Sequence, residues 1–244
     1  MKHCSLHHLF LFLLVVASPA GVTLAAEAPP RSEAAQRWAE YEPVFQAFAA
    51  SDLAHPPAPG GIVFAGSSIF REWTTMAELM APLPVLNRAF GGSRTGDQLA
   101  RFDQVILSYA PKVIVYYCGS NDIKEGTMPP EIAANFRAFA TRVHAVLPRT
   151  RILFVSILKA PEKQDRWQLV DEANGLIRQF CAGDAHLGFI DVNPAVFTAD
   201  GHPRLELYRE DKLHYLSPAY EGFTAIIKPE LTKVWDAQQS APTP

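Results

Sequence analysis

The feature that most constrains the fold of this chain is a series of short apolar runs, each of which ends at a turn. The runs cover residues 62–65, 85–90, 112–118, 151–157 and 188–192. A strand that is apolar at nearly every position, rather than at every second one, is typical of a parallel sheet covered on both faces. The series therefore predicts a sheet of five buried strands.

Segments with helical periodicity alternate with these runs. They cover residues 33–48, 97–109, 131–147 and 165–181, and a last helix is expected from Pro218 toward Trp235. Strands that alternate with helices predict an α/β fold with a mainly parallel sheet, whereas residues 193–209 have no clear period and are expected to be irregular. Ligands of such folds bind beyond the carboxyl ends of the strands, so we expect the functional residues in the turns there.

Length and charge limit the classes of protein to consider. With 244 residues and 48% hydrophobic content, the chain can bury one sizeable core. Its net charge of −3, its pI near 6.2 and the lack of a basic run give no electrostatic reason to expect nucleic acid or an anionic membrane surface as partner. One globular domain is therefore expected.

The N-terminus has the pattern of a secretory signal peptide. Lys2 gives a positive start, residues 9–17 are apolar, and Ala26-Glu27-Ala28 fits the A-x-A form of a cleavage site. An uncleaved anchor is the alternative, but the apolar run is short for a bilayer. We expect residues 1–28 to be removed and the protein to be secreted or periplasmic, without stable membrane insertion.

The mature chain is expected to have three parts. Residues 29–60 form an N-terminal helix and a proline-rich linker that packs on the domain, residues 61–237 form the domain itself, and residues 238–244 form a frayed tail.

Cys118 and Cys181 are the cysteines of the expected mature chain. They could form a disulfide in an oxidising compartment, but their spacing does not show whether the side chains meet, and we favour two buried, unpaired thiols. Neither has a cysteine or histidine at metal-ligand spacing, so we expect no metal site.

The first apolar run leads into Gly66-Ser67-Ser68, which predicts a tight turn into a helix. A serine at a strand end, with its backbone N–H at the start of a helix, is placed to act as a nucleophile and to bind the oxyanion that it creates. The alternative is that the serines only cap the helix, since serine is a preferred N-cap residue. The rest of the chain decides between these interpretations.

A serine nucleophile needs an adjacent base, which histidine supplies near neutral pH. In Asp211-Lys212-Leu213-His214 the carboxylate precedes the imidazole by three residues, so one turn brings it to Nδ1 and leaves Nε2 free to accept a proton. The other histidines of the mature chain are expected to be solvated or packed: His55, His144, His186 and His202. Of these, His202 is the competitor for the role of base, because Asp200 lies nearby, but its glycine and proline neighbours indicate a turn that is not tied to a strand end.

Gly92 and Asn121 lie in the turns after the second and third runs. The neutral amide of Asn121 suits the stabilisation of developing negative charge, and a glycine lets a ligand approach the backbone closely. Both are also common turn residues, and the two roles are compatible.

Taken in order, four blocks resemble the SGNH, or GDSL-like, hydrolase family: Gly66-Ser67-Ser68-Ile69, Gly92, Gly119-Ser120-Asn121-Asp122 and Asp211-x-x-His214. Each block is weak alone, but their order is specific, and the resemblance runs from about Gly61 to the final helix. Trp73 and Phe90-Gly91-Gly92-Ser93 make the chain similar to esterases that resemble platelet-activating-factor acetylhydrolase subunits.

The resemblance implies a flavodoxin-like, three-layer α/β/α sandwich and an ester hydrolase that uses no cofactor. It implies that Ser68 is the nucleophile and that Asp211 and His214 complete a catalytic triad. It further implies an oxyanion hole formed by the backbone N–H groups of Ser68 and Gly92 and by the side-chain amide of Asn121. Residues 61–237 would then be the hydrolase domain.

The chain departs from the family pattern at Ser67, where the family usually has aspartate. A hydroxyl is expected to hold the turn less firmly than a carboxylate that accepts backbone hydrogen bonds. The departure also leaves two neighbouring serines as candidate nucleophiles, of which the family register selects Ser68.

We expect a serine esterase for short acyl groups such as acetyl, because no long apolar lid segment is visible. Its substrate would be a small-molecule or glycan ester, for example an acetylated polysaccharide or cell-wall sugar; lysophospholipids or other lipid esters are the alternative. Trp73 and Trp167 could stack on sugar rings, although core packing is the favoured role for both.

Two other classes of protein were weighed. A catalytically inactive carbohydrate- or envelope-binding module on the same scaffold is possible because a fold does not determine its function. A nucleotide-binding protein is disfavoured, since neither G-x-G-x-x-G nor G-x-x-x-x-G-K follows a strand.

Overall fold

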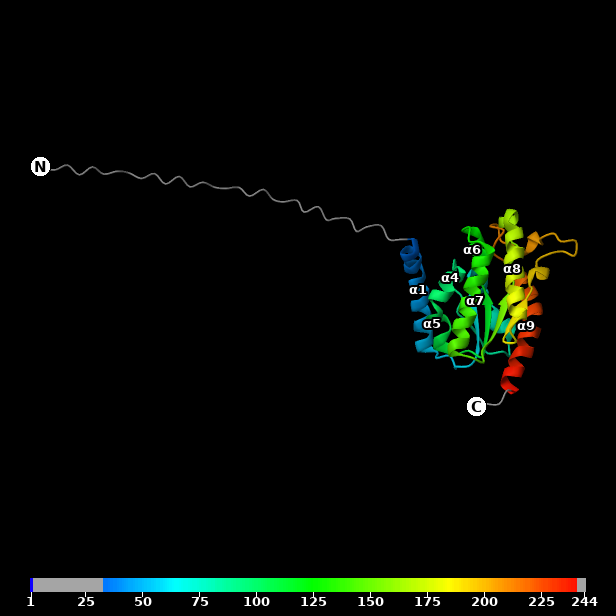
Figure 1. The fold of residues 1–244 in the computed structure, drawn as a ribbon, viewed down its shortest axis with the longest axis horizontal. Coiled ribbons are helices and arrows are strands. Elements are labelled where there is room, and N and C mark those ends of the chain that lie inside the picture. Colours follow the sequence, from blue (N-terminus) through cyan, green and yellow to red (C-terminus); the bar gives the residue numbers. More distant parts are fainter. Residues whose placement is uncertain (2–32, 241–244) are drawn as a thin grey trace.

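Five parallel strands form the centre of the structure, a computed structural model that describes Met1 and residues 33–240 (Figure 1). The strands are β1 (Ile62–Gly66), β2 (Val85–Asn87), β3 (Val113–Tyr117), β4 (Arg151–Val155) and β5 (Leu187–Ile190). Their order is β2-β1-β3-β4-β5, and each neighbouring pair is parallel. This is the strand order of flavodoxin-like folds, and it brings all five carboxyl ends to one edge of the sheet.

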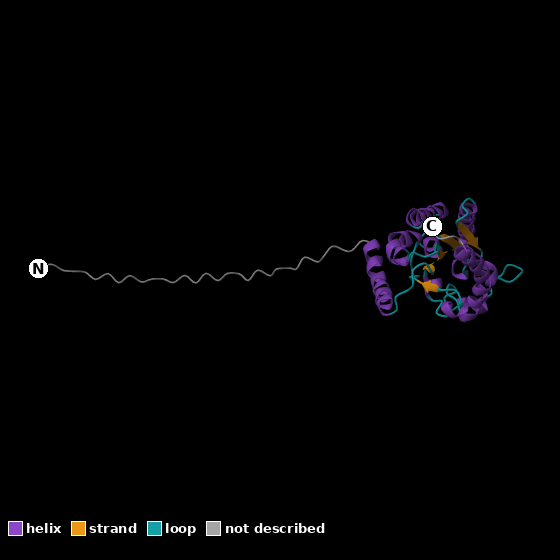
Figure 2. Cartoon of the chain, turned by 90° about the horizontal axis from the view of Figure 1, so that it is seen from below, coloured by secondary structure: helices purple, strands orange, loops and turns teal. Residues whose placement is uncertain are grey.

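Helices cover both faces of the sheet, as the view along the sheet in Figure 2 shows. One face is covered by α1 (Glu33–Ala54), α4 (Thr95–Ala100), α5 (Phe102–Val105), α7 (Pro129–Val146) and α8 (Trp167–Ala182). The other face is covered by α2 (Ser68–Arg71), α3 (Met76–Met80) and α9 (Ser217–Ser240). The predicted α/β class and its three-layer α/β/α arrangement are therefore confirmed.

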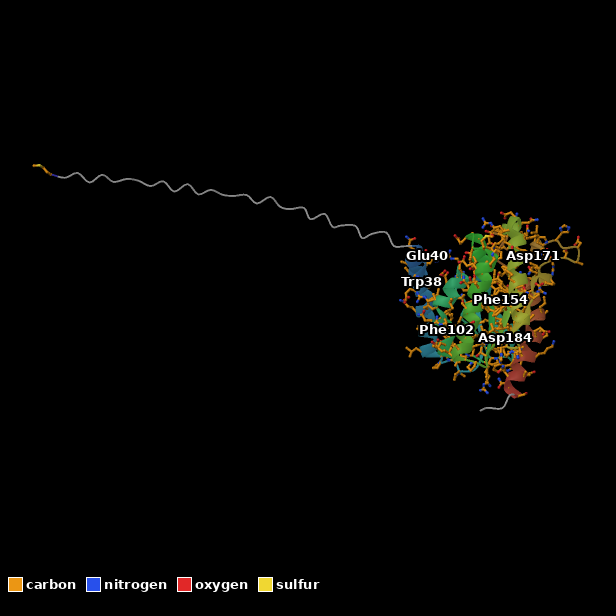
Figure 3. The ribbon with its side chains drawn as sticks, in the orientation of Figure 1. Trp38, Glu40, Phe102, Phe154, Asp171 and Asp184 are labelled. Carbon is orange, nitrogen blue, oxygen red and sulfur yellow. The ribbon has the colours of Figure 1, made fainter. Side chains whose placement is uncertain are left out.

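Side chains that alternate along the strands divide the core into two halves. In the half beneath α7, Tyr116 lies 4.7 Å from Phe139 and Phe154 lies 4.7 Å from Phe136 between ring centroids. Figure 3 marks Phe154 in this half and Phe102 nearer to α1. Each buried ring of this kind stabilises the fold by roughly 2 kcal/mol, so this face is firmly held.

Trp73 belongs to the other half of the core. It is 1% exposed and packs against Phe64, Tyr220 and Phe223, with ring centroids 5.3 to 6.3 Å apart. Its burial leaves no free ring face for a sugar. Trp167 is partly buried and packs edge-on against Phe197.

The segment predicted as one helix over 97–109 is broken into three short pieces. They are α4, α5 and a 3₁₀ turn at Leu107–Tyr109, separated by non-helical backbone at Arg101 and Ile106. Val105 and the adjacent Ile106, at the end of the second piece, are both fully buried against the sheet.

The second strand is shorter than its predicted range of 85–90. Regular pairing ends at Asn87, but the N–H groups of Arg88 and Phe90 still donate to Phe64 O and Gly66 O, at 2.8 and 2.9 Å. The chain therefore continues beside β1 and carries Gly92 to the carboxyl edge of the sheet.

Both chain ends differ in extent from the expectation. The first helix continues to Ala54 before the predicted linker, and the last begins at Ser217 and runs to Ser240. The expected frayed tail is thus wrong for residues 238–240, because Gln238 donates to Arg149 O at 3.1 Å and Lys112 donates to Gln239 at 3.1 Å.

The predicted leader, apart from Met1, lies outside the described residues, as do residues 241–244. Among the residues that the structure describes, no helix is both long and apolar enough to cross a membrane.

Cys118 and Cys181 are both buried and unpaired, as expected. Burial raises the pKa of the Cys181 thiol to about 12 and the pKa of Cys118 well above its ordinary value. Both thiols therefore behave as small core residues.

Candidate active site

The serine turn is built on a glycine that no other residue can replace without strain. Gly66 ends β1 with φ +155°, and a Cβ placed on it would lie 2.1 Å from the carbonyl oxygen of Tyr117 in the neighbouring strand. This close approach of β1 to β3 lets the chain turn sharply into α2. The turn presents Ser68 at the carboxyl edge of the sheet.

Ser68, His214 and Asp211 come together at this edge. Ser68 Oγ lies 3.0 Å from His214 Nε2, and His214 Nδ1 lies 2.6 Å from Asp211 Oδ2. The carboxylate accepts from the Nδ1–H and so fixes the tautomer in which Nε2 accepts the Ser68 proton. Two residues 146 positions apart in sequence are thereby joined, which is the arrangement that activates a serine hydroxyl.

The Asp211 carboxyl is held in its ionised form. Burial opposes ionisation, but hydrogen bonds from the His214 ring and from the backbone N–H groups of His214 and Leu213 outweigh it and lower the pKa of Asp211 to about 2. The carboxyl group is therefore charged at every pH at which the imidazole can act as a base.

Ser67 is excluded from this arrangement by its surroundings. It is 2% exposed, and its Oγ contacts the backbone N–H of Ser68 at 2.6 Å and Nδ2 of Asn121 at 3.0 Å. The hydroxyl thus accepts local hydrogen bonds, as the family's aspartate is expected to do. Of the two serines, the geometry joins only Ser68 to the imidazole.

The three predicted oxyanion donors lie around the same turn. The N–H of Ser68 and the amide of Asn121 both point to Ser67 Oγ, and the Asn121 amide also donates to Ser93 O at 3.0 Å. Gly92 has φ +75°, with open space where a Cβ would be, and its N–H makes no hydrogen bond to the described part of the chain. An arrangement of this kind can hold negative charge that develops beside Ser68.

Two residues to which the sequence analysis gave no role, Gln98 and Asp122, hold the turns around Ser68 in place. Gln98 is fully buried, and its Nε2 donates to Gly66 O at 2.9 Å and to Ser93 Oγ at 2.8 Å. Asp122 accepts from the backbone N–H of Thr95 at 3.0 Å, which ties the turn after β3 to the start of α4. Burial raises the pKa of Asp122, although the hydrogen bonds from Thr95 act against the shift.

The loop that carries His214 is folded back on itself. Tyr208 and Tyr215 form an antiparallel bridge, and the N–H of Arg209 donates to His214 O at 2.8 Å. Lys212 has a left-handed backbone with φ +54°, and its carbonyl accepts from the N–H of Glu162. These contacts orient Asp211 and His214 although no strand runs beneath them.

Glu72 is a further charged residue at the site. Its Oε1 lies 3.9 Å from His214 Nε2 and 2.8 Å from Arg71 Nη2, and its Oε2 lies 2.8 Å from Arg209 Nη1. The sequence analysis did not single it out. The only signal was its four-residue spacing from Ser68, which is the spacing of residues on one helical face.

The other histidines lie away from the serines. His144 contacts Thr150 O at 3.1 Å, His186 lies 3.3 Å from Asp184, and His202 lies 3.7 Å from Asp200 on the surface. None of these contacts reaches a serine, as expected.

A polar pocket of about 360 Å³ lies beside Gly92 and Asn121. Its other lining residues are charged or polar: Gln36, Arg37, Glu40, Arg94, Lys124 and Glu125. Glu40 is marked on α1 in Figure 3, so the N-terminal helix forms one side of the pocket. Among the described residues, no cluster of histidine, cysteine and carboxylate side chains could hold a metal ion.

The sequence model of the GDSL-like Lipase/Acylhydrolase family matches residues 63–221, which include Ser68, Gly92, Asn121, Asp211 and His214. The chain belongs to this family and is an ester hydrolase of the SGNH type.

Solved structures with the same fold include enzymes of this class. A Streptococcus pneumonia protein provisionally described as a platelet activating factor is 22% identical, with a TM-score of 0.70, and the match covers 82% of this chain and 97% of that one. A GDSL-like lipase from Bacteroides thetaiotaomicron is 19% identical, with a TM-score of 0.64 and coverage of 78% and 97%. The family 3 carbohydrate esterase of Clostridium thermocellum is 12% identical, with a TM-score of 0.59 and coverage of 73% and 99%. No curated protein matches the chain in sequence.

Proposed function

We propose that the protein is a serine esterase that works through an acyl-enzyme on Ser68. The observation that carries the proposal is the chain of contacts from Ser68 Oγ to His214 and on to Asp211, at 3.0 and 2.6 Å. His214 Nε2 takes the hydroxyl proton as Oγ attacks the ester carbonyl. Asp211 keeps the imidazole oriented and stabilises the imidazolium that forms.

The oxyanion of the tetrahedral intermediate is proposed to be bound by the N–H groups of Ser68 and Gly92 and by the Asn121 amide. In this step the first and third of these donors turn from Ser67 Oγ to the stronger, charged acceptor. His214 then protonates the leaving alcohol, and water releases the acyl group in a second cycle of the same kind.

The polar pocket supports an ester whose alcohol part is a sugar or a similar hydroxylated group. Its lining combines cationic donors such as Arg37 and Arg94 with the carboxylate acceptors Glu40 and Glu125. Charges of both signs match a neutral group rich in hydroxyls better than they match a lipid chain. The similarly folded carbohydrate esterase is consistent with this proposal. We propose a short acyl group, such as acetyl.

Replacement of the proposed nucleophile tests the mechanism. We expect Ser68→Ala to lower the hydrolysis of 4-nitrophenyl acetate by about 10⁴-fold or more, as removal of a triad nucleophile does, and Ser67→Ala to lose far less. A fluorophosphonate should label the wild-type protein and Ser67→Ala, but not Ser68→Ala. Retained activity in Ser68→Ala with loss in Ser67→Ala would reassign the nucleophile, and a wild type that takes no label would favour an inactive binding module.

The substrate class is tested by two parallel series. Hydrolysis of 4-nitrophenyl esters from acetyl to dodecanoyl measures the acyl preference, and acetate release from a panel of acetylated glycans measures the alcohol preference. We expect the rate to fall as the acyl chain lengthens. A preference for long chains or for lysophospholipids would contradict the sugar-ester proposal.

We propose that residues 1–28 direct export of the protein and are removed near Ala28. Expression of the full chain in a bacterial host, followed by mass analysis of the exported protein, measures the cleavage position. An intact N-terminus in the membrane fraction would indicate an anchor instead.

A further inference from the structure

A small pocket separate from the one beside Gly92 lies next to Glu72. Its volume is about 190 Å³, and its lining includes Glu72, Thr74, Arg209, Tyr215, Ser217 and Tyr220. These six side chains are polar or carry a polar end, as does Thr75, and Leu216 is the one apolar residue of the lining. A cavity with this lining and size is suited to several water molecules rather than to an apolar group.

Tyr220 gives water a specific reason to enter this pocket. Its side chain is 4% exposed, and its hydroxyl makes no hydrogen bond to any residue that the structure describes. A buried hydroxyl without a partner is unfavourable, so water is the natural partner for it here.

Glu72 connects this pocket to the reacting atoms. Its Oε1 lies 3.9 Å from His214 Nε2, the nitrogen that also lies 3.0 Å from Ser68 Oγ. A separation of 3.9 Å is too long for a hydrogen bond, but one water can contact both atoms at ordinary lengths of about 2.8 Å. Arg71 and Arg209 hold the two carboxylate oxygens in place.

We propose that Glu72 is a positioning residue that holds the hydrolytic water of deacylation, and that the pocket beside it supplies this water. The proposal rests on the acyl-enzyme proposed above. The water hydrogen-bonds to Glu72 Oε1 through one proton and gives the other to His214 Nε2, while its oxygen bonds to the acyl carbonyl carbon. The bond from that carbon to Ser68 Oγ then breaks, Nε2 returns the proton to Oγ, and the carboxylic acid leaves.

The proposal separates the two half-reactions. In acylation the nucleophile is Ser68 itself, so no bound water is needed. Loss of the Glu72 carboxylate should therefore slow deacylation more than acylation. If Glu72 had only the structural role of pairing with Arg71 and Arg209, its loss would displace His214 and slow acylation and deacylation alike.

Rapid-mixing hydrolysis of 4-nitrophenyl acetate by Glu72→Gln tests this difference. We expect the acylation phase to stay within about threefold of the wild type and the steady-state rate to fall about ten- to a hundredfold, the range set by a hydrogen bond to a charged group. Hydroxylamine should recover part of that rate, because a stronger nucleophile depends less on positioning. The matched control is Glu78→Gln, an exposed glutamate on α3, which should behave as wild type.

Equal losses in both phases, or an unchanged steady-state rate, would overturn the proposal. If Glu72→Gln fails to fold, Tyr220→Phe keeps the ion pairs of Glu72 and should still slow only deacylation; no effect or an effect on both phases would again overturn it. Failure of the esterase proposal is recognised separately, because the wild-type Ser68 would then take no fluorophosphonate label.

Discussion

The two halves of the active site are held in different ways. Ser68 follows a buried strand, and its turn is fixed by contacts with β3 and by the fully buried Gln98. Asp211 and His214 lie on a surface loop, where the side chains are 48% and 20% exposed. The serine half is thus part of the folding core, whereas the histidine half depends on a few local hydrogen bonds. Changes in the first should damage stability, and changes in the second should damage activity far more than stability.

Among the changes that test this comparison, the largest effect is expected from Asp211→Asn. Without the carboxylate, the imidazole loses the partner that fixes its tautomer, so kcat for 4-nitrophenyl acetate should fall by about 10²- to 10⁴-fold. The free energy of unfolding at neutral pH should change little, because the side chain is half exposed. Denaturant unfolding and steady-state kinetics measure the two effects. The neighbouring Glu210→Gln serves as the control, and a large loss of stability in Asp211→Asn would break the comparison.

Gly66→Ala should have the converse effect. Its Cβ would lie 2.1 Å from Tyr117 O in a conformation that L residues avoid, so the strands must separate. We expect a loss of about 3 kcal/mol or more in the free energy of unfolding, within the range for severe core changes.

Gly96→Ala is the matched control for that variant. Gly96 lies in α4 with open space at its Cβ position, and alanine should stabilise this helix by up to about 1 kcal/mol. A Gly66→Ala protein that unfolds like the wild type would show that the serine half is less tightly built than the contacts indicate.

The smallest effect concerns acid stability. Because the pKa of Asp211 is lowered from 3.8 to about 2 on folding, its ionisation stabilises the fold above about pH 4, and that contribution disappears as the pH falls toward 2. The difference in unfolding midpoint between wild type and Asp211→Asn should therefore shrink between pH 5 and pH 2.5. A difference that stays constant over this range would contradict the assignment of the low pKa.

The comparison also explains what the sequence could predict. The strands were recognisable because burial on both faces leaves nearly continuous apolar runs, and the order of the blocks placed Ser68, Asn121 and His214 at one edge. Asp211 and His214 were recognisable because their contact is made within one turn of chain. Each of these signals is local or depends on an order that parallel sheets impose.

The supporting residues that were not predicted make contacts with residues far away in the sequence. Gln98 reaches Gly66 across 32 positions, and Arg209 meets Glu72 only after the loop folds back. The strand order and the breaks in 97–109 depend on packing between elements, which periodicity along one segment does not contain. The role of Ser67 depends on its surroundings, because a hydroxyl beside a nucleophile can react or accept hydrogen bonds, and its burial and its contacts with Ser68 and Asn121 distinguish the two.

The first helix has a consequence for how this enzyme can diversify. It lies outside residues 63–221, yet its Tyr41 hydroxyl contacts Gly92 O at 3.3 Å and its Glu40 and Arg37 line the polar pocket. If that pocket selects the alcohol part of the ester, then exchanging one N-terminal helix for another would retarget the catalyst while every group that breaks the bond stays untouched. Part of the substrate choice would then be encoded in a stretch of sequence separate from the groups that carry out the chemistry.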